Sequence, residues 1–360
     1  MASGSLQVAA SLLGPAFRGL ILKKGKTGRS IQVALHHDVT FDFEYHRDFP
    51  EMARLYEAAK TSQWNATTDL DWTQNVDRYE RMLLPTEMLP IFGHPAFNSL
   101  NAREQADQRH ATLSWLLSQF LHGEQGALFA AAQVTQAVPW LDGKLYGASQ
   151  VADEGRHVEV FHAYLTRKLE KLYQINDNLY VVIDALMTDS RWDMKFLGMQ
   201  ILIEGLALGA FGTFRVLSDE PLLKQLLTFV ITDEARHVHY GVLALGNFFS
   251  KELTESERRF REDWTFEMVL LLRNRFLAHE LYDEYWGHAL SRRAWDARVL
   301  KSPMMGFFRS TMFRRIIPNV KKIGLLTDRV RPRYEKLGLL GYEAGRDATA
   351  LTSTDLLENR

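Results

Sequence analysis

The chain contains the pattern Asp-Glu-x-Arg-His twice, as Asp153-Glu154-Gly155-Arg156-His157 and as Asp233-Glu234-Ala235-Arg236-His237. The two copies begin 80 residues apart, and in each a glutamate precedes a histidine by three positions. Residues three apart on a helix lie on one face, one turn apart, so each pair can share a metal ion. A single pair of this kind is commonplace on a solvated helix face, but its repetition predicts one metal site between two helices.

A further glutamate lies 30 residues before each copy: Glu124 precedes Glu154, and Glu204 precedes Glu234. A helix, a short turn and a return helix bring residues about 30 apart to the same level of an antiparallel pair. Four helices then contribute four carboxylates and two imidazoles to one point inside a bundle, which is the dinuclear carboxylate arrangement. The predicted metal ligands are Glu124, Glu154, His157, Glu204, Glu234 and His237.

The types of these residues restrict which metal ions the site can bind. Four carboxylates neutralise two divalent ions, whereas the same carboxylates buried without metal would cost several kcal/mol each or take up protons. Oxygen ligands with one imidazole per ion suit iron or manganese. The chain has no cysteine, which excludes iron–sulfur clusters, zinc ribbons, disulfides and thiol nucleophiles.

The rest of the chain predicts an all-α fold. Its 360 residues are 46% hydrophobic and 24% charged, as in soluble globular proteins, and a net charge of −1 gives no field for nucleic acid. No proline lies between Pro139 and Pro221 or between Pro221 and Pro303, which leaves room for long helices. We expect helices over about 101–138, 143–174, 190–218, 221–250 and 255–290, another near 50–61, and at most a short strand at 31–35.

Helix starts agree with these ranges. Pro221 suits a first helical turn, and capping boxes are expected from Ser190 with Asp193 and from Thr254 with Glu257. Three parts are predicted: an N-terminal segment packing on the bundle (1–97), the helical bundle itself (98–290), and a basic C-terminal extension (291–360).

One stretch imitates a membrane span. Residues 196–214 carry a single charge, Glu204, and a carboxylate at the centre of a span is expensive. We expect a buried helix of a protein that is cytoplasmic and not transmembrane. Gly205, Gly209 and Gly212 either open space along this helix for substrate or O2, or permit close helix packing.

At these residues the sequence resembles the ferritin-like di-iron carboxylate superfamily, and within it the oxygen-activating branch of ribonucleotide reductase small subunits and bacterial multicomponent monooxygenase large subunits. The likeness rests on Gly123–Ala127, on both Asp-Glu-x-Arg-His copies and on the segment 54–72, which includes Trp64. It implies a ferritin-like four-helix bundle with extra helices at both ends.

The resemblance also implies roles for single residues. Glu124, Glu154 and His157 would bind one iron, and Glu204, Glu234 and His237 would bind the other. Asp153 would support His237, and Asp233 would support His157. Arg156 and Arg236 would form ion pairs with those aspartates.

Three positions depart from the family patterns and restrict the reactions that the resemblance implies. Phe161 occupies the position of the radical tyrosine of reductase small subunits, Leu208 that of a threonine of the multicomponent hydroxylases, and Val230 that of a third histidine of aryl-amine N-oxygenases. Together with Phe120 and Phe211, Phe161 and Leu208 are the candidates for an apolar substrate pocket; simple core packing is the alternative.

The sequence therefore predicts a di-iron oxidase or oxygenase in which O2 is the co-substrate and a peroxo or high-valent di-iron species hydroxylates, N-oxygenates or desaturates a small hydrophobic or aromatic molecule. The cofactor would be two iron ions, with a manganese–iron pair as the other choice, and a reductase or ferredoxin would donate electrons. The alternatives are a ferroxidase that handles iron and a metal-cofactor protein similar to the reductase small subunits.

The C-terminal region leaves several partners open. Residues 309–336 are strongly basic, which fits a solvated face, an acidic redox partner or carrier protein, or a membrane surface contacted through Phe307, Phe308 and Phe313. We favour the first two and expect no nucleic acid. Helical proteins of this type commonly pair, so a homodimer is also an expectation.

Overall fold

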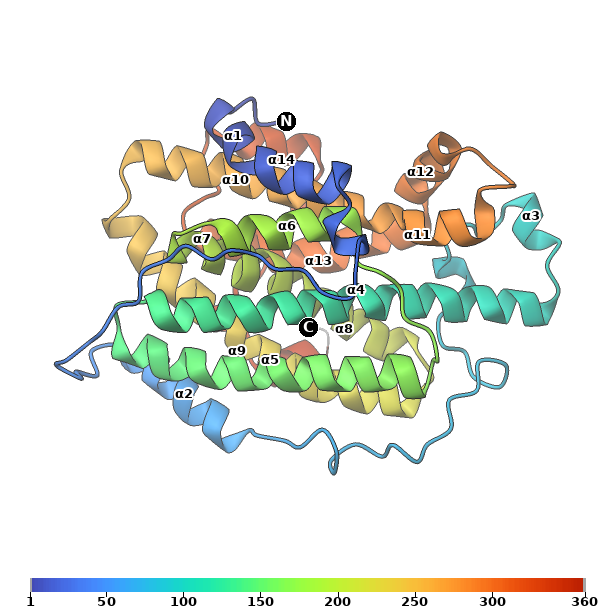
Figure 1. The fold of residues 1–360 in the computed structure, drawn as a ribbon, viewed down its shortest axis with the longest axis horizontal. Helices are drawn as coiled ribbons and strands as arrows, with labels where there is room; N and C mark the ends of the chain where they lie inside the picture. Colours follow the sequence, from blue (N-terminus) through green and yellow to red (C-terminus); the bar gives the residue numbers. More distant parts are fainter. Residues whose placement is uncertain (1, 359–360) are drawn as a thin grey trace.

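Four long helical segments form the centre of the protein (Figure 1). They are α4 (Ala102–Ala137), α5 (Leu141–Arg167), the continuous run of α7 (Trp192–Phe196), η4 (Leu197–Glu204) and α8 (Gly205–Leu217), and α9 (Pro221–Lys251). The computed structural model describes residues 2–358 without the side chains of Phe307 and Phe308, and no β-strand occurs in this part. The all-α prediction is confirmed.

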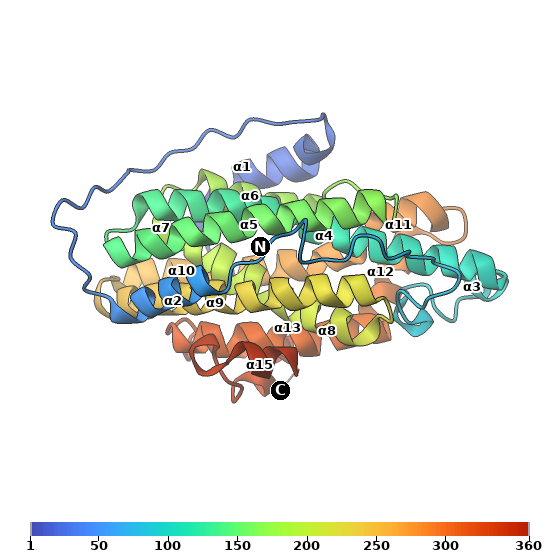
Figure 2. The same ribbon diagram turned by 90° about the horizontal axis from the view of Figure 1, so that it is seen from below.

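Shorter elements surround the four segments. Before them in the chain come α1 (Leu6–Ala16), η1 (Phe17–Ile21), α2 (Pro50–Thr61) and α3 (Pro95–Asn98), and α6 (Asp177–Thr188) lies between α5 and α7. After them come α10 (Glu255–Asn274), η5 (Arg275–Leu277), α11 (His279–Leu281), η6 (Tyr282–Trp286), α12 (Arg292–Lys301), α13 (Pro303–Lys322), α14 (Arg331–Lys336) and α15 (Ser353–Leu357). Single turns lie at η2 (Lys24–Lys26), η3 (Thr86–Met88), η7 (Leu340–Tyr342) and η8 (Ala348–Ala350). Figure 2 shows α13 and α15 on the side of α8 and α9 that faces away from α4 and α5.

Most predicted helices begin and end near their expected residues. The helices α4 and α9 lie within one residue of the predicted bounds at each end, and α2 matches the range 50–61. The helix α5 ends seven residues early, because the chain turns through Glu170 with a φ of 50° to enter α6, which was not predicted. Residues 31–35 form no strand.

Two further boundaries were wrong for identifiable reasons. The capping box at Thr254 and Glu257 is present, but the one expected from Ser190 and Asp193 is not. The Asp193 carboxylate instead accepts a hydrogen bond of 2.7 Å from the buried Arg261. The helix predicted over 255–290 is broken after Asn274, where Ala278 takes a left-handed φ of 48°.

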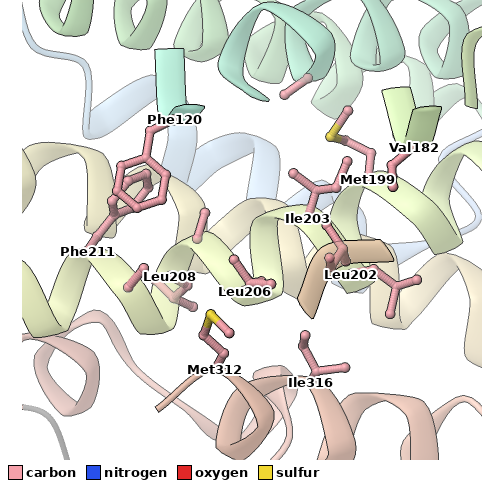
Figure 3. Packing of buried hydrophobic residues seen from close by; sticks show 14 of the residues in the cluster. Phe120, Val182, Met199, Leu202, Ile203, Leu206, Leu208, Phe211, Met312 and Ile316 are labelled. Atoms are coloured by element: carbon pink, nitrogen blue, oxygen red, sulfur yellow. The ribbon is translucent and has the colours of Figure 1, made fainter. Parts of the chain in front are cut away.

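The apolar run Trp192–Leu217 is long and apolar enough to cross a membrane, but every residue of its most apolar window is buried inside the protein. Figure 3 shows how: side chains from α4, α6 and α13 pack on Met199, Ile203 and Leu208 from different sides. The prediction of a buried helix is confirmed. Lipid is not needed to cover this segment.

The basic C-terminal region folds onto the bundle and pairs much of its charge within the chain. Arg331 lies 2.6 Å from Glu343, and Arg333 lies 2.5 Å from Asp263. Lys321 also contacts Glu343, at 3.2 Å. Of the three phenylalanines that the membrane alternative would use, Phe313 is buried, whereas the side chains of Phe307 and Phe308 lie outside the described residues.

Gly209 decides how closely α8 approaches α13. A Cβ atom at this position would lie 2.6 Å from the carbonyl oxygen of Thr311, whereas at Gly205 and Gly212 it would meet atoms no closer than 3.8 Å. The contact at Gly209 is with helix backbone, which cannot rotate away as a side chain can. Close helix packing therefore explains this glycine.

We expect Gly209→Ala to lower the free energy of unfolding by about 1–3 kcal/mol, because the two helices must separate. Chemical denaturation measures the change. Gly246→Ala on α9 is the matched control, since a Cβ there meets nothing within 4 Å, and it should stabilise the protein by about 0.5–1 kcal/mol. Equal effects of the two substitutions would show that the close contact is not what Gly209 provides.

Candidate metal centre

The six predicted ligands converge from four helical segments. Glu124 comes from α4, Glu154 and His157 from α5, Glu204 from the last residue of η4, and Glu234 and His237 from α9. The exposed fraction is 4% for Glu124, 2% for Glu204 and zero for the other four. The structure thus brings into one buried place the residues that the spacing of 30 and the repeat of 80 selected.

Their donor atoms form two overlapping groups. One consists of Glu124, Glu154, His157 and Glu234, the other of Glu154, Glu204, Glu234 and His237, and within each group one atom per residue lies within 4.8 Å of the others. Glu154 and Glu234 belong to both groups. Such an arrangement could hold two adjacent ions: each group has its own histidine and its own further glutamate, and Glu154 and Glu234 would be available to both.

The cluster is incomplete without a further group. Oε2 of Glu154, Oε2 of Glu204, both carboxylate oxygens of Glu234 and Nδ1 of His237 are buried and have no hydrogen-bond partner in the described part of the chain. Buried polar atoms are almost always hydrogen-bonded. Two divalent ions would supply the missing partners and balance four carboxylates, so the donor set fits iron or manganese. The ligand role of each residue remains a prediction.

Protons replace metal in the metal-free protein. Burial raises the pKa of Glu124 and of Glu204 well above the ordinary value, and the charge of Glu234 raises both further. Burial opposes the charged form of His157, yet its hydrogen bonds to Asp233 and Glu124 help to raise its pKa well above the usual value. The metal-free cluster therefore holds protons that metal ions would displace.

A second layer of charges orients the two histidines. Nε2 of His157 lies 3.2 Å from Oδ2 of Asp233, and Nε2 of His237 lies 3.3 Å from Oδ2 of Asp153. The pairing is crossed, because each aspartate comes from the same helix as the other histidine. Since Nε2 can donate to the aspartate, Nδ1 of each ring is left facing the cluster as a metal donor.

The two arginines complete this layer. Arg156 contacts Asp153 and lies 3.4 Å from Asp233, while Arg236 contacts Asp233 and lies 3.5 Å from Asp153. Two aspartates and two arginines thus form a neutral group. Trp64 also donates a hydrogen bond of 2.8 Å to Asp233.

Sequence reasoning missed two amides. Nε2 of Gln150 donates to Oε1 of Glu204 at 3.0 Å, and Gln200 donates to Oε1 of Gln150 at 3.4 Å. A signal was available, because each glutamine lies four residues before a predicted ligand, Glu154 or Glu204. The π-helical turns of η4, which end at Glu204, were not predictable from periodicity; such segments often mark functional sites.

A small cavity adjoins the cluster on the side of Glu124 and Glu204. Its volume, about 10 Å³, is near that needed by one water molecule. Apolar atoms provide most of its wall, and the lining residues are Gln119, Phe120, Gly123, Glu124, Ala127, Ile203, Glu204, Ala207, Glu234 and Arg275.

Only one of the four predicted pocket residues lines this cavity. Phe120 does so, while Phe161 and Phe211 stack on one another with ring centroids 5.6 Å apart and lie behind it. Leu208 points toward Met312 of α13 (Figure 3). Phe161 belongs to α5, and Leu208 and Phe211 belong to α8; all three are buried. Their part in a substrate pocket stays a prediction. Arg275 was not among the candidates.

Comparison with known proteins gives limited matches. No protein-family model and no curated protein matches the sequence. Among solved structures, the fold is similar to variants of an R2-like ligand-binding oxidase with anaerobically reconstituted Mn/Fe cofactor. Two of these have 18% and 19% sequence identity, TM-scores of 0.48 and 0.49, and alignments covering 79% and 77% of this chain and 96% and 99% of theirs.

We expect Glu204→Gln to stabilise the metal-free protein and to weaken metal binding. Because the pKa of Glu204 is raised on folding, the folded state binds the extra proton above pH 4.5, and the free energy of unfolding falls as pH rises. Glutamine removes that loss, about 1–3 kcal/mol at pH 7, and can still accept from Gln150. Denaturation from pH 5 to 8, with chelator and then with metal, measures both effects.

The control is Glu159→Gln. Glu159 is exposed on α5, and its substitution should change neither the pH dependence nor the stabilisation by metal. A Glu204→Gln protein that is less stable than the wild type by the same amount at every pH would contradict the expected role of the carboxylate.

Proposed function

We propose that this protein is a metal-dependent oxidase that holds two iron ions, or one manganese and one iron, at the carboxylate–histidine cluster and uses O2 to oxidise a small organic molecule. The observation that carries the proposal is the pair of overlapping four-residue donor groups that share Glu154 and Glu234 in a fully buried place. When bound, two such ions supply electrons for the reduction of O2 and a strong oxidant for the organic substrate.

The chain itself does three things toward this chemistry. Its glutamates would neutralise the ions, so that a charged centre can exist inside an apolar bundle. Asp153 and Asp233 hold the imidazole rings in one orientation. The buried walls exclude bulk water, which would otherwise compete with substrate for an oxidant.

The cavity next to Glu124 and Glu204 is the proposed place of oxidation. Phe120, Ile203 and Ala207 give it an apolar wall, which favours a substrate with a hydrophobic or aromatic part. Electrons for repeated turnovers would come from a reductase or ferredoxin. Trp64, which is 7% exposed, follows the C-terminal end of α2 and donates a hydrogen bond to Asp233, and so connects this part of the chain to the aspartates around the cluster.

Metal loading followed by exposure to O2 tests the proposal. The protein is loaded anaerobically with ferrous iron alone, or with manganese and ferrous iron together, and bound metal is counted by elemental analysis. We expect two ions per chain in the wild type and clearly fewer in Glu204→Ala and His237→Ala, because each removes a donor from a group of four. Less than one tightly bound ion in the wild type would overturn the proposal.

The chain offers a matched control on α5. Glu159 and His162 have the same spacing as Glu154 and His157 but are exposed on the outer face of the helix. Glu159→Ala and His162→Ala should keep two ions. O2 uptake is then measured with a reductant: repeated uptake that depends on an organic molecule supports an oxidase, whereas a single oxidation of ferrous iron, independent of organic molecules, would indicate a ferroxidase instead.

A further inference from the structure

Arg275, the first residue of η5, is a buried cation without an anionic partner. Its exposed fraction is 3%, and its guanidinium makes no hydrogen bond or ion pair with residues 2–358; its contact is with the ring of the neighbouring Phe276, 4.9 Å away. Other buried arginines are paired: Arg261 donates to Asp193 at 2.7 Å, and Arg236 contacts Asp233.

An unpaired buried charge is costly. Burial alone lowers the pKa of Arg275 to about 10, and no carboxylate opposes that effect. The side chain nevertheless keeps its proton at neutral pH. A positively charged residue therefore lines the cavity that Glu124 and Glu204 also line.

A count of the charges around the cluster leaves Arg275 without a counter-charge. Two divalent ions would neutralise the four glutamates of the cluster, and Arg156 and Arg236 already balance Asp153 and Asp233. The loaded centre would then be neutral, and Arg275 would leave the cavity with one positive charge. A ligand with one negative charge would restore neutrality.

The cavity has the features of a site for such a ligand. Arg275 provides its cationic part, Phe120, Ala127 and Ile203 its apolar wall, and Glu124 the side of the metal cluster. Gly123, although buried, would place a Cβ with nothing within 4 Å, so the space begins directly at the α4 backbone. At about 10 Å³ the cavity must widen by side-chain movement to admit more than a water molecule.

We infer that Arg275 binds the carboxylate of an organic acid whose apolar part lies along Phe120 and Ile203, with its oxidisable carbon toward the metal cluster. The inference rests on the proposed function and names its substrate class. A carboxylate is favoured because its two oxygens match the fork of a guanidinium and because its single charge balances Arg275. A phosphate monoester carries about −1.5 to −2 at neutral pH, which would leave an excess of negative charge.

Ligand binding tests the inference without turnover. The wild type and Arg275→Gln are loaded with Mn²⁺ under anaerobic conditions and titrated by calorimetry with acetate, hexanoate and benzoate, and with the neutral amide of each. We expect the wild type to bind at least one acid roughly 10- to 100-fold more tightly than its amide. In Arg275→Gln this preference should disappear, while two metal ions per chain remain bound.

A second variant keeps the test decisive if Arg275→Gln fails to fold. Gly123→Leu fills the cavity and leaves Arg275 in place, so it should abolish acid binding while helical content and metal count are unchanged. Gly123→Ala, which adds one methyl group to open space, is the milder control and should still bind acetate.

Three results would overturn the inference. They are equal affinity of the wild type for acids and amides, no acid binding at all, and loss of metal from Arg275→Gln, which would make Arg275 a counter-charge of the cluster. Failure of the proposed function is seen separately, because it appears in the metal count of the wild type rather than in the acid-to-amide ratio.

Discussion

The burial of four glutamates at one point is the constraint on which the rest of this structure depends. Taking a carboxylate out of water costs several kcal/mol unless cations or protons compensate, and here Glu154 and Glu234 are wholly buried with oxygens that lack hydrogen-bond partners. Such a point can exist only in a scaffold rigid and large enough to bear the cost. Helices α4 and α9 provide this scaffold, because each extends well beyond the cluster in both directions.

The same constraint explains the layers around the cluster. Histidines that would donate to a metal ion need a fixed orientation, and Asp153 and Asp233 provide it from the opposite helix. Those aspartates are themselves buried, so Arg156 and Arg236 must balance them. The apolar run Trp192–Leu217 follows from the same logic. A helix that delivers Glu204 to the centre is covered on all sides and has no solvated face, which is why its composition imitates a membrane span.

Most of the cluster and of the long helices could be predicted from the sequence, because the regular geometry of a helix fixes where residues of known spacing lie. The repeat of 80 and the offset of 30 placed Glu124 and Glu204 beside the two Glu-x-x-His pairs, and the scarcity of proline predicted the long helices. What failed depended on contacts between distant residues. Asp193 looked like part of a cap until Arg261, 68 positions later, was seen to bind it. The short α6 and the π-helical η4 have no distinct period, and an apolar run does not reveal that Leu208 faces α13.

Arg275 shows most clearly where sequence reasoning ends. Nothing in its surroundings along the chain distinguishes it from Arg273, two residues earlier on α10, which is only half-buried. Its meaning comes from the charge balance of the folded site. Arg156 and Arg236 balance the two aspartates, two divalent ions would balance the four glutamates, and one cation remains. Burial gives that remaining charge its importance, because water would screen it elsewhere. A buried charge that the fold leaves unpaired beside the carboxylate–histidine cluster calls for a partner that enters the site, and this is why we propose for Arg275 a role in substrate recognition rather than in the scaffold.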